Sequence, residues 1–204
     1  MVKMSAIAIE VDHDELQSII ERFYKAKRAL FCWGTMGIGK SDKVRDAGKA
    51  IAKSMGLIFT EDLRHINSMK HFLVIDVRLS QCDPSDLRGI PYRNEAGDTT
   101  IWLPPSTFPR QGFGIILFDE MNLAPPLVQA SAYQFILDRK LGEYRMPDGY
   151  GVLAAGNRLE DRANFINMNG SLPIPDYFWN HVSSFELVLS DRMLKCVRDG
   201  STTS

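Results

Sequence analysis

The chain has few of the features that mark membrane, secreted or metal-stabilised proteins. No apolar run in its 204 residues approaches membrane-spanning length, and the N-terminus shows no signal-peptide pattern. Its three cysteines, Cys32, Cys82 and Cys196, are odd in number, far apart and without metal-ligand spacing, and its four histidines are scattered. We therefore expect a reduced, cytoplasmic protein with no membrane association.

The chain also lacks a bias of charge and any repeated segment. Its 24 Lys and Arg residues are balanced by 25 Asp and Glu residues, for a formal net charge of −1, so electrostatics does not indicate nucleic acid as a partner. The length suits one α/β domain better than two. We expect a core domain over residues 1–194 and a short polar tail over 195–204.

A complete phosphate-loop motif is present between an apolar run and a helix-compatible stretch. Residues 34–41 read Gly-Thr-Met-Gly-Ile-Gly-Lys-Ser, after the apolar run 29–33 and before the helix-compatible stretch 42–55. The glycines let successive backbone N–H groups point at a phosphate chain, and Lys40 can reach the β- and γ-phosphates. The alternative is a glycine-rich turn with an incidental lysine. The predicted nucleotide-binding residues are Gly34, Thr35, Met36, Gly37, Ile38, Gly39, Lys40 and Ser41.

A second motif, 79 residues after Lys40 (119 − 40), favours hydrolysis. Residues 113–120 read Phe-Gly-Ile-Ile-Leu-Phe-Asp-Glu, which is typical of a buried parallel strand that ends in two carboxylates. Such carboxylates face the crevice where an α/β sheet binds its ligand. We predict that Ser41 and Asp119 hold Mg²⁺ and that Glu120 deprotonates the attacking water. A kinase more often carries one carboxylate here, and an ordinary strand that ends in solvated acids is the structural alternative.

A third polar position follows another apolar strand, 38 residues after Asp119 (157 − 119). Residues 151–155 read Gly-Val-Leu-Ala-Ala, and Gly156-Asn157-Arg158 comes next. A side chain at the tip of that strand could hydrogen-bond both the γ-phosphate and the lytic water, so Asn157 is a candidate catalytic residue. Taken alone, Gly-Asn-Arg is merely a turn, because glycine and asparagine tolerate turn geometry.

The rest of the pattern predicts strands that alternate with helices. We expect a parallel sheet with helices on both faces and a β-hairpin insertion over residues 91–102, with Gly97 in its turn. The other expected elements are a helix capped by Asp12 or Asp14 that runs to Lys27, a strand over His71–Val77 and a helix from Pro125 or Pro126 to Lys140.

Taken together, these strings resemble the MoxR-like branch of the AAA+ ATPases, close to the dynein-related AAA class. The resemblance runs from about Leu16 to Leu194, and the Asp-Glu-x-Asn-x-Ala-Pro string from Asp119 is far more restrictive than a generic acidic strand end. It implies an α/β P-loop NTPase fold (the AAA+ large subdomain) and ring-forming, Mg-ATP-dependent remodelling of other proteins, often alongside a von Willebrand factor A-type partner. The matching strings are residues 33–41, 76–81, 83–89, 102–105, 118–126 and 154–158.

The sequence departs from this family in two places. His181 stands where the family has an arginine that reaches into the neighbouring subunit's site, and the segment 165–175 is also altered. Such an arginine contributes about 10³- to 10⁵-fold in turnover, and Arg162 or Arg192 could substitute for it. Only 15 residues (190 to 204) follow Leu189, too few for the family's helical lid. We expect a fragment, a lidless version, or a lid supplied by another polypeptide.

These motifs and departures are compatible with three functions. The first is an ATPase that hydrolyses Mg-ATP and acts on a protein partner, as a homo-oligomeric ring if the lid is supplied. The second is a nucleotide-dependent binding module with little hydrolysis, and the third is a GTP-specific relative of the McrB type. Residues 79–91 and the hairpin 91–102 are candidates for the surface that faces a protein substrate, or they are a structural connection between strands.

Overall fold

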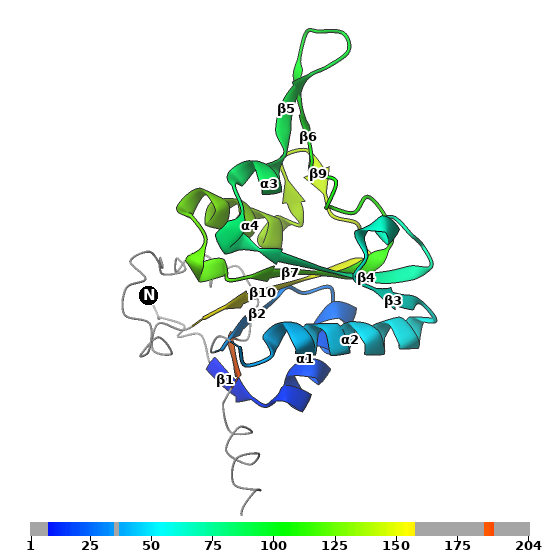
Figure 1. Ribbon diagram of the computed structural model, residues 1–204, viewed down its shortest axis with the longest axis vertical. Coiled ribbons are helices and arrows are strands. Elements are labelled where there is room, and N and C mark those ends of the chain that lie inside the picture. The colour runs from blue at the N-terminus through cyan, green and yellow to red at the C-terminus, as the bar shows by residue number, and fades with distance from the viewer. Residues whose placement is uncertain (1–7, 35–36, 158–185, 190–204) are drawn as a thin grey trace, which may run out of the picture.

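A parallel β-sheet forms the centre of the chain. The computed structural model describes residues 8–34, 37–157 and 186–189, and of 8–10 and 186–189 it describes the backbone alone. The described strands form one seven-stranded sheet in the order β1-β11-β2-β10-β7-β4-β3, with all neighbours parallel (Figure 1). In that order they are Ala8–Val11, Glu186–Leu189, Leu30–Trp33, Tyr150–Gly156, Phe113–Asp119, His71–Arg78 and Ile58–Thr60.

Helices cover both faces of this sheet, as the sequence predicted. Helices α1 (His13–Lys25) and α2 (Lys40–Met55) lie below the sheet in Figure 1, and α3 (Pro84–Arg88) and α4 (Pro126–Asp138) lie above it. Within the described ranges, no helix has both the length and the apolar character needed to cross a bilayer. The part of the chain that the structure describes also has three short 3₁₀ turns, η1 (Leu63–His65), η2 (Leu79–Gln81) and η3 (Met121–Leu123).

The sheet separates two hydrophobic cores because successive residues of a strand point to opposite faces. In β7, Ile116 and Phe118 belong to the core under α4, whereas Ile115 and Leu117 belong to the core under α1 and α2. All four side chains are buried. Each side chain of this kind contributes about 1.5–3 kcal/mol when fully buried. A strand buried on both faces needs a continuous apolar run, which is why this segment was recognisable in the sequence.

Several boundaries and short elements differ from the expectation. Helix α2 begins at Lys40, at the end of the phosphate loop as expected, whereas α4 ends at Asp138 and not at Lys140, because Arg139 takes up the left-handed conformation (φ 53°). The cap of α1 is Asp12, whose side chain accepts from the backbone N–H groups of residues 14 and 15. The unpredicted elements include β1, β3, α3 and the two-residue strands β8 (Lys140–Leu141) and β9 (Tyr144–Arg145).

The predicted hairpin projects from the side of the sheet that carries α3 and α4 (Figure 1). Strand β5 (Ile90–Arg93) pairs with β6 (Thr100–Leu103), and Gly97 lies in the turn with φ 75°. Ile90 is opposite Leu103 and Tyr92 is opposite Ile101, which places four apolar side chains on one face of the ribbon. Ile90 and Tyr92 are 65% and 59% exposed, so this face meets solvent in the chain as described.

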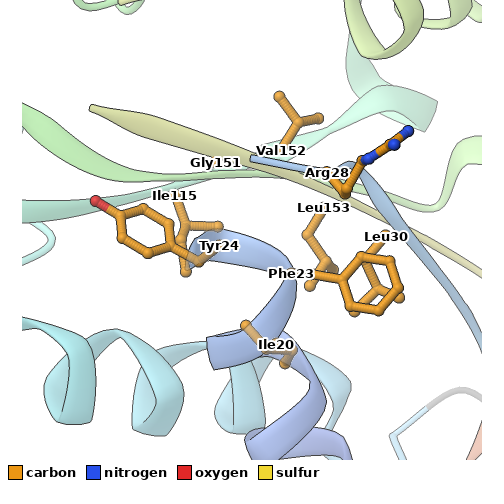
Figure 2. Close-up of a pocket in the computed structure, with 9 residues that line it drawn as sticks. All are labelled: Ile20, Phe23, Tyr24, Arg28, Leu30, Ile115, Gly151, Val152 and Leu153. Carbon is orange, nitrogen blue, oxygen red and sulfur yellow. The ribbon is translucent and has the colours of Figure 1, made fainter. Parts of the chain in front are cut away.

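A small apolar pocket lies at the N-terminal ends of β2, β10 and β7 (Figure 2). Tyr24 borders it, and its hydroxyl donates to the carbonyl of Gly149 at 2.8 Å. The enclosed space fits about one water molecule, which is far too little for a nucleotide. Its lining residues are Ile20, Phe23, Tyr24, Arg28, Leu30, Ile115, Gly151, Val152 and Leu153.

Candidate functional site

The polar residues singled out from the sequence meet at the C-terminal edge of the sheet. The register pairs Trp33 with Gly156 and Arg78 with Asp119, so strands β2, β10, β7 and β4 end side by side. Whatever follows each strand therefore faces the same crevice, where open α/β sheets bind ligands. The phosphate loop, Asn157, Glu120 and Ser80 follow these four strands in that order.

The phosphate loop leads directly into α2. Gly37 and Gly39 have φ values of 79° and 91°, a region that glycine enters without steric cost. Gly39 is the N-cap of α2 and provides no side-chain hydrogen bond to the helix start. The first N–H groups of this 16-residue helix consequently have no capping side chain, which suits them to bind an anion. Thr35 and Met36 lie outside the described residues.

Lys40 connects the loop to the neighbouring strand β10. Its side chain is buried, and Nζ donates to the carbonyl of Gly34 at 2.8 Å and to Oδ1 of Asn157 at 2.9 Å. The ammonium is thus held between the first residue of the loop and the tip of β10. The sequence brought Lys40 and Asn157 together only through the order of their motifs, and the structure places them in direct contact.

Asn157 is held in turn by a second buried asparagine, Asn122 of η3. The Asn122 amide donates to the Asn157 carbonyl at 2.7 Å, and its Oδ1 accepts from the Asn157 backbone N–H at 3.0 Å. Asn122 is only 3% exposed, so these hydrogen bonds do not compete with water. The last residue of β10, Gly156, must also lack a side chain, because a Cβ there would lie 2.7 Å from the Trp33 ring.

The two predicted metal ligands are neighbours. Ser41 Oγ donates to Asp119 Oδ2 at 3.2 Å, and the other carboxylate oxygen accepts from the Glu120 backbone N–H at 2.8 Å. A hydroxyl and a carboxylate oxygen at this separation match the oxygen donors that Mg²⁺ prefers. Mg²⁺ usually takes one or two such protein ligands and fills its remaining positions with water and substrate phosphates. The residues present therefore fit a magnesium ion.

Glu120 leaves the line of its strand. Its backbone is left-handed, with φ 55° and ψ 34°, which costs a non-glycine residue about 1–2 kcal/mol. Its carboxylate accepts a hydrogen bond from the hydroxyl of Ser80, which follows β4 in η2. The group predicted to act as the base is therefore held by a residue from the adjacent strand end. This strained turn at a candidate catalytic position is typical of functional sites.

An arginine balances the acids at the rim of the site. Arg45 of α2 donates to Glu61 at 2.6 Å and lies 3.9 Å from the Asp76 carboxylate. Burial, reinforced by the nearby Asp119, raises the pKa of Asp76. The guanidinium groups of Arg78 and Arg45 act in the opposite direction. A cation bound beside Asp119 would therefore also favour the ionised form of Asp76.

The cysteine beneath the loop is structural. Cys32 of β2 is buried, and its thiol donates to the Trp33 carbonyl at 3.5 Å. Burial raises the pKa of Cys32 to about 12, although the positive charge of Lys40 acts in the opposite direction. The thiol stays protonated at neutral pH, so Cys32 is not a nucleophile in this site.

Some residues of the site were not predicted from the sequence, and some predicted residues lie outside the described part of the chain. His13, Ser80 and Asn122 were not assigned roles, although Ser80 and Asn122 lie within the strings that carried the family resemblance. Asn122 could have been found from the sequence because it is a polar residue among apolar ones, just before two prolines. The predicted substitution at the finger position, His181, lies outside the described residues, as do the two arginines proposed to replace it.

The fold is similar to that of solved structures. The crystal structure of "a putative ATPase" from Cytophaga hutchinsonii has a TM-score of 0.54 at 19% identity, over 96% of this chain and 53% of that one. NtrX from Brucella abortus, alone and in complex with ADP, has TM-scores of 0.48 at 14% identity, over 91% and 93% of this chain and 38% and 36% of those. No protein-family model and no curated protein matches the sequence.

The likeness to the Cytophaga hutchinsonii structure, together with the sheet order, confirms the predicted fold class. The chain has an α/β fold in which helices cover both faces of a parallel sheet, with a separate antiparallel hairpin. At 19% identity the likeness concerns the fold alone. The chain spans about half the length of that neighbour, which is 53% covered.

Replacing Asn122 by alanine tests whether this residue holds the site together. The change leaves the buried N–H and C=O groups of Asn157 without their side-chain partners, and each such loss costs about 1–3 kcal/mol. We expect Asn122→Ala to lower the free energy of unfolding by about 2 kcal/mol or more in chemical denaturation. The control is Asn94→Ala, because Asn94 bonds Asp98 and Thr99 in the exposed hairpin turn. Equal losses in the two variants would contradict this role.

Proposed function

We propose that this chain binds Mg-ATP at the C-terminal edge of its sheet and hydrolyses it. The observation that carries the proposal is the buried ammonium of Lys40, 7% exposed, between Gly34 and Asn157 at the start of α2. The ammonium lies at the start of α2, whose first N–H groups have no capping side chain. A phosphate bound there would accept charge-assisted hydrogen bonds from this ammonium, and such bonds are about twice as strong as neutral ones.

The side chains around Lys40 supply the other parts of phosphoanhydride hydrolysis. Ser41 and Asp119 would hold Mg²⁺, which when bound neutralises charge on the phosphates. The carboxamide of Asn157 would orient a terminal phosphate or a water molecule. Glu120 would accept the proton of that water, because it is the carboxylate next to the metal ligand Asp119 and is not itself assigned to the metal.

A second candidate function is a nucleotide-dependent switch with little turnover. The hydrogen bond between Ser80 and Glu120 favours it, because this bond occupies an oxygen of the carboxylate that would accept the proton from water. The histidine at position 181 also favours it, since histidine lacks the forked donor of arginine. A GTP-specific activity of the McrB type is the third possibility, and competition of ATP and GTP for a fluorescent nucleotide separates it from the first two.

We further propose that nucleotide-dependent changes at this edge act on a protein partner. The four apolar side chains on one face of the β5–β6 hairpin support this idea, because exposed apolar ribbons of this kind serve as contact surfaces. The family resemblance implies that this partner is a protein of the von Willebrand factor A type. It also implies that the chain assembles into a homo-oligomeric ring. Residues 79–91, which lead into the hairpin, would belong to the same surface.

Removal of the Lys40 charge tests the nucleotide site. Lys40→Met keeps most of the buried stem and removes the ammonium, so we expect the affinity for Mg-ATP in calorimetry to fall about 100-fold or more. The control is Lys49→Met, since Lys49 lies on the same helix with a side chain 59% exposed. The control should bind like the parent. A folded Lys40→Met protein with undiminished affinity would rule out the phosphate-loop assignment.

Removal of the carboxylate of Glu120 separates binding from chemistry. Glu120→Gln keeps an oxygen that can accept from Ser80 but removes the base, so we expect Mg-ATP to bind within about threefold of the parent. Phosphate release should fall about 100-fold or more, because a positioned general base contributes about 10²- to 10⁴-fold. Glu143→Gln, at an exposed glutamate in the β8–β9 turn, is the control. Equal turnover in Glu120→Gln and the parent would exclude Glu120 as the base.

A further inference from the structure

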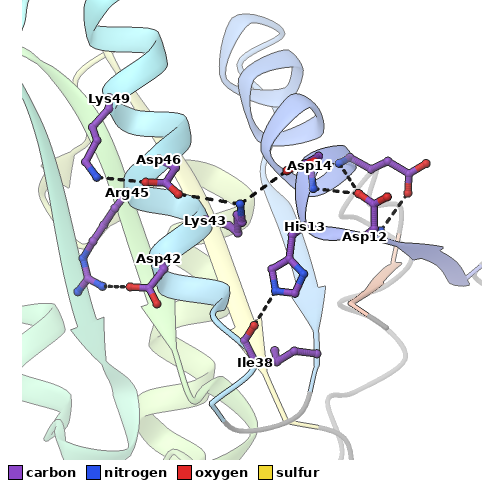
Figure 3. A network of polar contacts seen from close by, with 10 residues as sticks. Asp12, His13, Asp14, Ile38, Asp42, Lys43, Arg45, Asp46 and Lys49 are labelled. Atoms are coloured by element: carbon purple, nitrogen blue, oxygen red, sulfur yellow. Dashed lines mark hydrogen bonds and ion pairs between the residues drawn. The ribbon is translucent and has the colours of Figure 1, made fainter. Parts of the chain in front are cut away.

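The first residue of helix α1 contacts the phosphate loop. His13 Nε2 lies 2.8 Å from the carbonyl oxygen of Ile38, which is 25 residues further along the chain. Figure 3 shows this contact between the start of α1 and the turn that leads into α2. Neither the loop motif nor the other parts of the proposed site require a residue at this position. The contact is therefore an independent feature of this chain.

The chemistry of the contact defines the form of the histidine ring. A carbonyl oxygen can only accept, so Nε2 carries the proton and donates it to Ile38. The other ring nitrogen, Nδ1, is buried and has no hydrogen-bond partner within the described part of the chain. The neutral ring with its proton on Nε2 satisfies both facts, because a second N–H on Nδ1 would be buried without an acceptor.

The contact also determines the direction of a backbone donor. A trans peptide is planar, so the Ile38 carbonyl and the Gly39 N–H of the same peptide unit point in opposite directions. Because the carbonyl is directed at His13, the Gly39 N–H is directed to the other side of the loop. Gly39 has φ 91°, and glycine rotates between backbone regions at little cost, so this peptide needs an external contact to keep one orientation.

Helix α1 is a firm support for that contact. Its start is fixed by the Asp12 capping box, and Leu16 and Ile20 are buried in the core beneath the sheet. Asp14 and Lys43 add an ion pair at 3.8 Å between α1 and α2, but Asp14 is 83% exposed, so this pair contributes little. The contact from the start of α1 to the loop itself is the hydrogen bond between His13 and the Ile38 carbonyl.

We propose that His13 is a positioning residue for the phosphate loop. It holds the Ile38–Gly39 peptide in the orientation in which the Gly39 N–H faces a bound phosphate, so the loop is organised before the ligand arrives. The inference rests on the proposed nucleotide site. Because His13 acts through a backbone donor to phosphate, its effect is the same for every ligand that carries two linked phosphates, with or without a nucleoside.

Substitutions that separate the ring from its donor test this role. His13→Phe keeps the ring and removes the donor, whereas His13→Gln places an amide donor at the reach of Nε2. Calorimetric titrations with Mg-ATP, Mg-ADP and Mg-pyrophosphate should show an affinity loss of about five- to tenfold for His13→Phe, equal for all three ligands. His13→Gln should restore affinity to within about twofold, and the control Asp14→Asn, which removes only the exposed ion pair, should bind like the parent.

Two further readouts separate this role from a general loss of stability. Nitrogen-15 NMR of the unliganded parent should show the His13 proton on Nε2, and the Gly39 amide signal should shift in His13→Phe but much less in His13→Gln. Full affinity of His13→Phe for the three ligands, or a loss confined to the two nucleotides, would overturn the inference while the parent still binds. Failure of the parent to bind any of the three would instead overturn the proposed nucleotide site and this inference with it.

Discussion

A buried lysine ammonium is the constraint on which the C-terminal edge of the sheet depends. An unpaired buried charge costs several kcal/mol, so the residues around Lys40 must supply oxygens at hydrogen-bond distance. One of these oxygens belongs to Asn157, whose backbone is bound on both sides by Asn122. Gly156 must lack a side chain for Trp33 and Asn122 to approach it. The first residue of α2 is thereby coupled to β2, β10 and η3.

In the proposed function, binding and chemistry would depend on different parts of this edge. Binding would rely on backbone N–H groups of the loop and on Lys40, whose ammonium bonds Gly34 and Asn157. Chemistry would rely on the turn after β7, where Glu120 is in a strained conformation and accepts from Ser80. A chain of this design would retain its ligand whether or not the base is free to act. The same residues therefore suit both a hydrolysing ATPase and a slow switch.

The sequence predicted the parts that leave a local signal. Strands β2, β4, β7 and β10 were predicted because strands buried on both faces are continuous apolar runs. Lys40, Asp119 and Asn157 were predicted because they belong to motifs at the C-terminal ends of β2, β7 and β10. Strands β1 and β3 have four and three residues and were missed, since their pairing with distant segments leaves no local pattern. Ser80 was missed as a functional residue for the same reason, because it meets Glu120 across 40 residues of chain.

The central claim is that a magnesium–nucleotide complex occupies the C-terminal edge of the sheet. A crystal structure with Mg²⁺ and a non-hydrolysable ATP analogue tests it most directly. The account predicts phosphate oxygens at about 2.7–3.2 Å from Lys40 Nζ and from the Gly39 backbone nitrogen. It also predicts Mg²⁺ at about 2.0–2.1 Å from Ser41 Oγ, with Asp119 bound directly or through water. An analogue bound elsewhere, with Lys40 still joined to Gly34 and Asn157, would contradict it.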